Sequence, residues 1–179
     1  MTAIAAIIAD GKIWMGGDSA GVCVGSLSLV VRKDPKVFIR DKFIIGFTSS
    51  FRMGNLLQYS FKIPDHPPKM PDDVYMNTIF IDAVRECFKN GGYSYTNNGQ
   101  ESGGQFMVGY NKKLYVIGGD FQVGVPVDNF SACGCGGDLC LGSLYSTANV
   151  QPDKRIKMAL HAAERFSGGV RQPFIIKSI

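Results

Sequence analysis

Residues 1–21 read MTAIAAIIADGKIWMGGDSAG, and this stretch decides the architecture of the chain. Segment 2–9 is apolar almost throughout, which is typical of a strand covered on both faces. The Asp-Gly dipeptide at 10–11 favours a two-residue hairpin turn, and apolar residues resume directly after it. That turn fixes a register in which Asp18 lies opposite Ala3. The hairpin therefore returns a carboxylate to the beginning of the chain.

Thr2 has the chemistry of a nucleophile. Once Met1 is removed, which the small Ala3 does not obstruct, Thr2 carries a hydroxyl and a free α-amine on one residue. An α-amine titrates near ~7.7–8.0 and can serve as the base for that hydroxyl at neutral pH. Strict strand alternation would place Asp18 on the opposite face from Thr2, so a shared site requires a bend at Gly16-Gly17 or a frayed strand end. The alternative is a terminal threonine without a chemical role.

The composition is that of one globular domain, and we expect residues 1–179 to form it. The formal net charge is +4 and the basic residues are scattered, which argues against a nucleic-acid partner. We find no run long enough to span a membrane and no secretion signal, so we expect a cytoplasmic protein without a membrane partner.

The 5 cysteines do not indicate a metal or another cofactor. Cys133, Cys135 and Cys140 form a C-x-C-x4-C pattern, but a structural zinc site needs four ligands. His66 and His161 are not at a recognisable ligand spacing. We therefore expect buried, reduced thiols.

The order of the predicted elements indicates an α+β fold. Two pairs of helices interrupt the strands, and runs of strands followed by runs of helices favour α+β layers over a doubly wound sheet. Two antiparallel sheets, each covered outside by a helix pair, would bury the first strand between them. The predicted helices cover 50–61, 72–89, 137–146 and 152–166; the strands cover 2–9, 12–18, 26–31, 36–40, 42–50, 105–110, 114–119, 129–137 and 172–179; hairpin turns fall at 10–11, 40–41 and 111–112; and 90–104 is a polar, glycine-rich loop.

Several motifs, in this order and spacing, resemble the proteasome β-subunits and especially their bacterial relative, the peptidase of the HslUV protease. They are the threonine after Met1, the Asp-Gly hairpin, GGDSAG, KVFIRDKFIIGFTSS, the GCGG turn and the ERFSGG helix end. The resemblance covers nearly the whole chain. It implies the four-layer αββα sandwich of N-terminal-nucleophile (Ntn) hydrolases, which agrees with the predicted layers.

The resemblance also implies roles for individual residues. Thr2 corresponds to the nucleophile, and Asp18 to the aspartate that holds a site lysine. Lys36, which precedes Val37, is our choice for that lysine. Lys33 is the alternative, because the segment after Asp18 is two residues longer here than in the family.

Three further positions depart from the family pattern. Ser50 stands where the family has a glycine whose N–H stabilises the oxyanion, and it can equally cap the next helix. Cys135 replaces a serine that contacts the threonine amine, and a thiol is a weaker donor. Glu164, followed by Ser167, replaces an aspartate and is one methylene longer. The resemblance places Gly21, Val22 and Thr48 at the substrate pocket.

The favoured function is a threonine peptidase that acts on peptides or unfolded proteins. The resemblance implies a homo-oligomeric ring enclosing a chamber, fed by a separate AAA+ ATPase unfoldase, since this chain contains no P-loop of its own. The alternatives are a non-catalytic ring or scaffold protein and a small-molecule amidohydrolase of the same fold.

Overall fold

The computed structural model describes all 179 residues and contains two main antiparallel sheets. The four-stranded sheet has the order β12-β1-β2-β13: Phe130–Cys133, Ile4–Ala9, Lys12–Gly17 and Ile175–Ser178. The five-stranded sheet has the order β11-β10-β9-β6-β5: Val123–Gly124, Lys113–Ile117, Phe106–Tyr110, Phe43–Phe47 and Val37–Arg40. Two short hairpins complete the strands, β3 (Ala20–Val22) with β4 (Leu29–Val31) and β7 (Tyr95–Asn97) with β8 (Gln100–Ser102).

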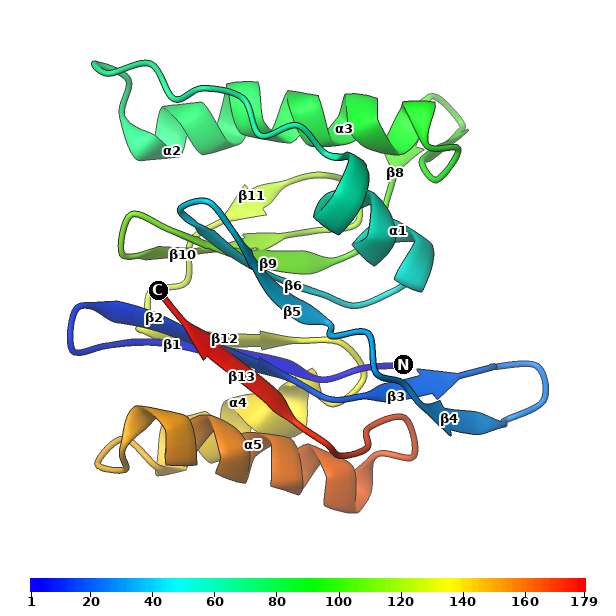
Figure 1. The fold of residues 1–179 in the computed structure, drawn as a ribbon, viewed down its shortest axis with the longest axis vertical. Coiled ribbons are helices and arrows are strands. Elements are labelled where there is room, and N and C mark those ends of the chain that lie inside the picture. Colours follow the sequence, from blue (N-terminus) through cyan, green and yellow to red (C-terminus); the bar gives the residue numbers. More distant parts are fainter.

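The helices come in two groups, as the sequence predicts. The first comprises α1 (Phe51–Asn55) with the π-helix η1 (Leu56–Ser60), and α2 (Asp72–Tyr75), the π-helix η2 (Met76–Phe80) and α3 (Ile81–Asn90). The second comprises α4 (Gly137–Ser146) and α5 (Pro152–Phe166). In Figure 1 the first group lies beside the five-stranded sheet and the second beside the four-stranded sheet, with the two sheets facing each other between them. None of the helices combines the length and apolar character needed to cross a membrane.

Strand β1 contributes to two different cores. Ala5 and Ile7 pack in the cluster that includes Leu160 of α5. Ile4 and Ala6 pack in the cluster between the sheets, together with residues of β6 and β9. Side chains alternate along a strand, so a strand buried on both faces must be apolar at every position. This explains the continuous apolar run of the N-terminal segment.

The N-terminal hairpin has the predicted register. Ile4 pairs with Gly17, and beyond the last pair the Asp18 N–H donates to the Ala3 carbonyl at 3.3 Å. Asp10 and Gly11 have φ values of 52° and 72°, as a two-residue turn of the favoured type requires. Asp18 thus leaves the strand next to the beginning of β1, and the predicted frayed strand end brings it near Thr2.

Some local predictions were wrong. The second hairpin pairs Arg40 with Phe43, so its turn is at 41–42 rather than 40–41. The predicted loop 90–104 contains the β7–β8 hairpin, and the strand predicted over 26–31 is confined to β4. Cys133 and Cys140 are buried as expected, but Cys135 is exposed. Tertiary contacts decide each of these features, and a single-sequence pattern does not contain them.

Candidate active site

Thr2, Lys36 and Asp18 form a connected chain of polar contacts. The Lys36 Nζ lies 2.9 Å from the Thr2 Oγ1 and 2.8 Å from the Asp18 Oδ1. Thr2 is 5% exposed, and Lys36 and Asp18 are each 1% exposed. A buried ammonium needs a partner of opposite charge, and the carboxylate supplies it. Lys33, the alternative, is exposed.

The Asp18 carboxylate is fully hydrogen-bonded. Its Oδ1 accepts from Lys36 and from the Ala3 N–H at 3.0 Å. Its Oδ2 accepts from the Ala20 N–H at 2.8 Å and the Arg171 N–H at 3.3 Å. Four donors match the lone-pair capacity of an ionised carboxylate. Asp18 therefore has a fixed orientation, and it fixes Lys36 in turn.

The pKa of Lys36 is lowered from its ordinary value. Burial is the main cause, because removal from water penalises the charged ammonium. The neighbouring Asp18 opposes this shift by Coulombic attraction and by its hydrogen bond.

Met1 occupies the space in front of Thr2. The Thr2 Oγ1 donates to the Met1 carbonyl at 2.6 Å, and the Met1 side chain lies against Gly169. The Thr2 nitrogen is a peptide amide here, and it donates to the Cys135 Sγ at 3.2 Å. The Cys135 Sγ lies 3.5 Å from the Ser167 Oγ. The structure thus brings Cys135 to the Thr2 nitrogen, and Ser167 contacts Cys135.

The GCGG turn presses against the backbone of Thr2. Gly134 has a φ of 91°, and a Cβ at this position would collide with the Thr2 carbonyl. The Gly136 N–H donates to the same carbonyl at 3.2 Å. A glycine is required at position 134 by both its conformation and its close contact.

Ser49 and Ser50, between β6 and α1, are the two candidates for a backbone donor near Thr2. The Ser50 N–H donates to the Thr48 carbonyl at 2.6 Å, and the Ser50 side chain caps α1. Ser49 has a φ of 57°, and its N–H donates to no acceptor in the protein. Ser49 is thus a second candidate for a backbone donor, next to the predicted Ser50.

A small cavity of about 60 Å³ adjoins Thr2. Val22 and Thr48 line it, together with Ser49 and Phe51. The Thr48 hydroxyl donates to the Gln105 carbonyl at 3.0 Å, so its proton is already used in a hydrogen bond within the protein. Gly21 is not among the lining residues.

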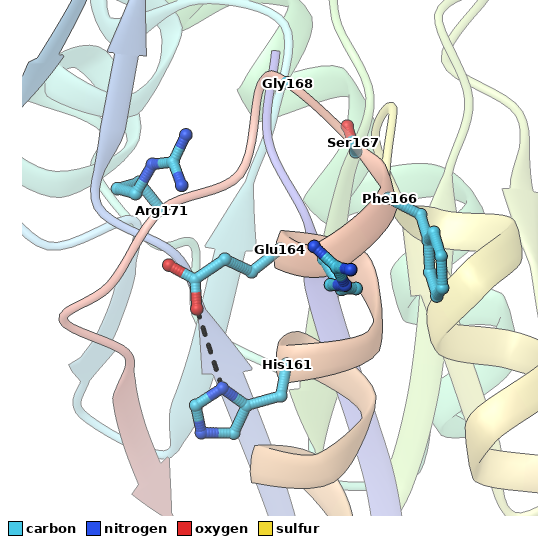
Figure 2. Close-up of a pocket in the computed structure, with 7 residues that line it drawn as sticks. His161, Glu164, Phe166, Ser167, Gly168 and Arg171 are labelled. Atoms are coloured by element: carbon cyan, nitrogen blue, oxygen red, sulfur yellow. Dashed lines mark ion pairs between the residues drawn. The ribbon is translucent and has the colours of Figure 1, made fainter.

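Glu164 lies on the last turns of α5, and Ser167 follows the helix directly. Glu164 does not reach the Thr2 nitrogen: its Oε1 accepts from the Gln172 N–H at 3.0 Å, and its Oε2 lies 3.5 Å from the His161 Nδ1. Figure 2 shows His161 and Glu164 at the end of α5, beside an open hollow of about 520 Å³ that Ser167 and Arg171 also line. The Glu164 carboxylate thus binds the loop that follows α5, and its assignment to the site stays a prediction.

Two contributors were missed by the sequence reasoning. Ser19 is 3% exposed; its N–H donates to the Arg171 carbonyl at 2.8 Å and its hydroxyl to the Pro173 carbonyl at 2.6 Å. The Arg171 N–H binds Asp18 from a segment far away in the chain. Ser19 follows Asp18 directly in GGDSAG, and that adjacency is the one signal that could have drawn attention to it.

The described residues include no cluster of three or more His, Cys, Asp or Glu side chains able to hold a metal ion. Thr2, Lys36 and Asp18 instead offer a hydroxyl, an ammonium and a carboxylate in hydrogen-bond distance of one another. This set can activate a hydroxyl nucleophile without a metal.

Solved structures share this fold. Thiobacillus denitrificans BPH matches with a TM-score of 0.82 at 16% identity, over 99% of this chain and 97% of that chain, and its complex with epoxomicin matches with a TM-score of 0.82 over 98% of that chain. Eukaryotic HslV from Trypanosoma brucei matches with a TM-score of 0.69 at 17% identity, over 99% of this chain and 98% of that chain. An Anbu (Gly-1) mutant from Hyphomicrobium sp. strain MC1 matches with a TM-score of 0.67 at 13% identity, over 98% of this chain and 80% of that chain.

No protein-family model matches the chain, and no curated protein matches it in sequence. At these low identities, the structural likeness concerns the fold. The chain therefore has the fold of these solved structures, which include an HslV, as the resemblance to proteasome β-subunits and the HslUV peptidase predicted.

Proposed function

We propose that this chain is an N-terminal threonine peptidase, a single domain over 1–179 with the four-layer αββα sandwich of Ntn hydrolases. The observation that carries the proposal is the Lys36 ammonium, buried between the Thr2 hydroxyl at 2.9 Å and the Asp18 carboxylate at 2.8 Å. A buried lysine in contact with the chain's second residue is difficult to explain by stability, because buried ion pairs contribute little to it.

The reaction begins after Met1 is removed. The Thr2 Oγ attacks a peptide carbonyl and forms an ester, while the hydroxyl proton passes to the Thr2 α-amine and then to the leaving amine as the C–N bond breaks. Water then attacks the ester, the new acid leaves, and the Thr2 hydroxyl is restored. Lys36 favours the deprotonated amine and the developing alkoxide through its positive charge.

The oxyanion requires a donor next to Thr2. We assign this role to the Ser49 N–H, because it has no other acceptor, whereas the Ser50 N–H is bonded to Thr48. Cys135 contacts the threonine nitrogen and would orient the amine, and Ser167 would support Cys135. Val22 and Thr48 border the adjoining cavity and would contact the substrate, with Gly21 beside them on β3.

The likeness in fold to HslV and BPH supports a proposal for the assembly and the substrate. We infer that the chain forms a homo-oligomeric ring around a chamber, cleaves peptides or unfolded proteins there, and works in the cytoplasm with a separate AAA+ unfoldase. The structure of BPH with epoxomicin supports a threonine-type nucleophile in a protein of this fold.

The test is hydrolysis of a set of fluorogenic peptides by protein whose loss of Met1 is verified by mass. We expect Thr2→Ala to abolish hydrolysis and Thr2→Ser to retain part of it. Hydrolysis that survives in Thr2→Ala contradicts the proposal. A Met1-free ring without hydrolysis would point to the scaffold alternative, and a solitary subunit that cleaves only small amides would point to the amidohydrolase.

A further inference from the structure

The loop that follows α5, residues 168–173, reaches the site from the far end of the chain. Its Arg171 N–H donates to the Asp18 Oδ2 at 3.3 Å. The other three donors to Asp18 are Ala3, Ala20 and Lys36. Only the bond from Arg171 depends on how the 168–173 loop is held.

Two side chains, those of Glu164 and Ser19, hydrogen-bond to the backbone of this loop. Glu164, on the last turns of α5, accepts the Gln172 N–H at 3.0 Å, and its side chain is 15% exposed. Ser19 donates its hydroxyl to the Pro173 carbonyl at 2.6 Å and its N–H to the Arg171 carbonyl at 2.8 Å. The residue that presents its N–H to Asp18 is therefore held through its own carbonyl, and the two residues that follow it are also anchored.

We propose that Glu164 and Ser19 are positioning residues that hold the 168–173 loop, so that the Arg171 N–H fixes the Asp18 carboxylate against Lys36. Neither side chain contacts Thr2. We call the contacts of Glu164 with Gln172 and of Ser19 with Arg171 and Pro173 the clamp. The catalytic consequence rests on the proposed function, but the clamp itself can be measured without activity.

The charged groups around Lys36 determine how loss of the clamp changes the pKa of Lys36. Lys36 faces Asp18, Cys135 and Arg32, and Asp18 is the main group that opposes the effect of burial on the pKa of Lys36. Weaker contact with Asp18 lowers the pKa of Lys36 further. The alkaline limb of the activity profile then moves to lower pH.

The groups around Glu164 are His161 at 3.5 Å and the two arginines, Arg165 and Arg171, that line the same hollow (Figure 2). Their side chains make no hydrogen bond to the Gln172 N–H. The side-chain amide that Glu164→Gln introduces can still accept the hydrogen bond from the Gln172 N–H through its oxygen. This variant therefore keeps the contact with the loop and removes only the negative charge.

The experiment compares Glu164→Ala, Ser19→Ala, their double variant and Glu164→Gln with the wild type. Asp153→Ala is the matched control, because it removes an exposed carboxylate from the same helix that makes no side-chain contact. The readouts are amide hydrogen exchange of 168–173 and, on Met1-free protein, the rate of epoxyketone adduct formation against pH.

We expect faster exchange of the Arg171 and Gln172 amides and a roughly tenfold slower adduct in either alanine variant, the effect of losing one charge-assisted hydrogen bond. The double variant should lose less than the product of the two single effects, because both residues hold one loop. Glu164→Gln should restore the wild-type rate and pH profile.

Wild-type exchange in both alanine variants overturns the clamp, whether or not the chain is a peptidase. Faster exchange with an unchanged adduct rate and profile overturns the positioning role and leaves the proposed function standing. If the wild type forms no adduct, the proposed function fails, and exchange alone decides the clamp.

Discussion

Replacing Lys36 with methionine tests the buried ion pair at the centre of the site. Methionine keeps most of the volume of the lysine stem but removes the ammonium, so Asp18 loses the 2.8 Å contact. Breaking a buried pair costs about 3–5 kcal/mol of unfolding free energy. Asp18 keeps three backbone N–H donors in this variant, so we expect the loss of unfolding free energy to lie at the lower end of that range, about 3 kcal/mol. For a chain of 179 residues this corresponds to a fall in Tm of about 6–12 °C.

The assay is thermal and denaturant unfolding at equal protein concentration, with peptide hydrolysis measured on the same samples. Lys33→Met is the matched control, since Lys33 is exposed and three residues away. We expect Lys33→Met to unfold like the wild type and to retain activity. Lys36→Met should lose activity by about a hundredfold or more, as expected when a group that assists proton transfer is removed.

A double-mutant cycle sharpens the result. If the two charges stabilise each other, Asp18→Asn combined with Lys36→Met should cost less than the sum of the single variants, by about 1 kcal/mol or more. Additive costs would refute the coupling. Wild-type unfolding and activity in Lys36→Met would refute the reasoning altogether.

Three further predictions concern other parts of the site. Because the pKa of Lys36 is lowered from 10.5, activity should begin to fall at a pH below that value. In the same pH range the contribution of Lys36 to the unfolding free energy should rise with pH, since the unfolded chain keeps the proton to higher pH than the folded chain. Rate profiles and thermal melts measured across pH check both expectations. Cys135 is exposed and touches the Thr2 nitrogen, so a maleimide should inactivate the wild type, while Cys135→Ser should resist it and stay active within about threefold, the effect of a changed single hydrogen bond. Gly134→Ala should destabilise the protein by about 1–3 kcal/mol because of its left-handed backbone, whereas Gly142→Ala, in open space on α4, should be stabilising by roughly 0.5–1 kcal/mol; comparison of denaturant midpoints tests this pair.

Local patterns were sufficient for much of the fold. The Asp-Gly turn fixed the register of the first hairpin, and apolar spacing located α3 and α5, because these features depend on neighbours a few residues apart. The approach of Asp18 to the chain's beginning followed from that register alone. The pairing of Lys36 with Asp18 needed the family resemblance, since strand and helix periodicity do not identify which of two nearby lysines turns inward.

The remaining features depend on contacts between distant segments. Glu164 binds Gln172 because of the path of the loop after α5, which no motif describes. The free N–H at Ser49 depends on a left-handed φ that a serine rarely adopts. The exposure of Cys135 reflects the way the GCGG turn lies against Thr2. Such details require coordinates.

The most direct test of the central claim is the intact mass of Met1-free protein after incubation with epoxomicin, with the modified residue located by peptide mapping. The account predicts one inhibitor per subunit on Thr2, and none on Thr2→Ala or on protein that retains Met1. Fully Met1-free protein that stays unmodified, or that is modified at another residue, would contradict it.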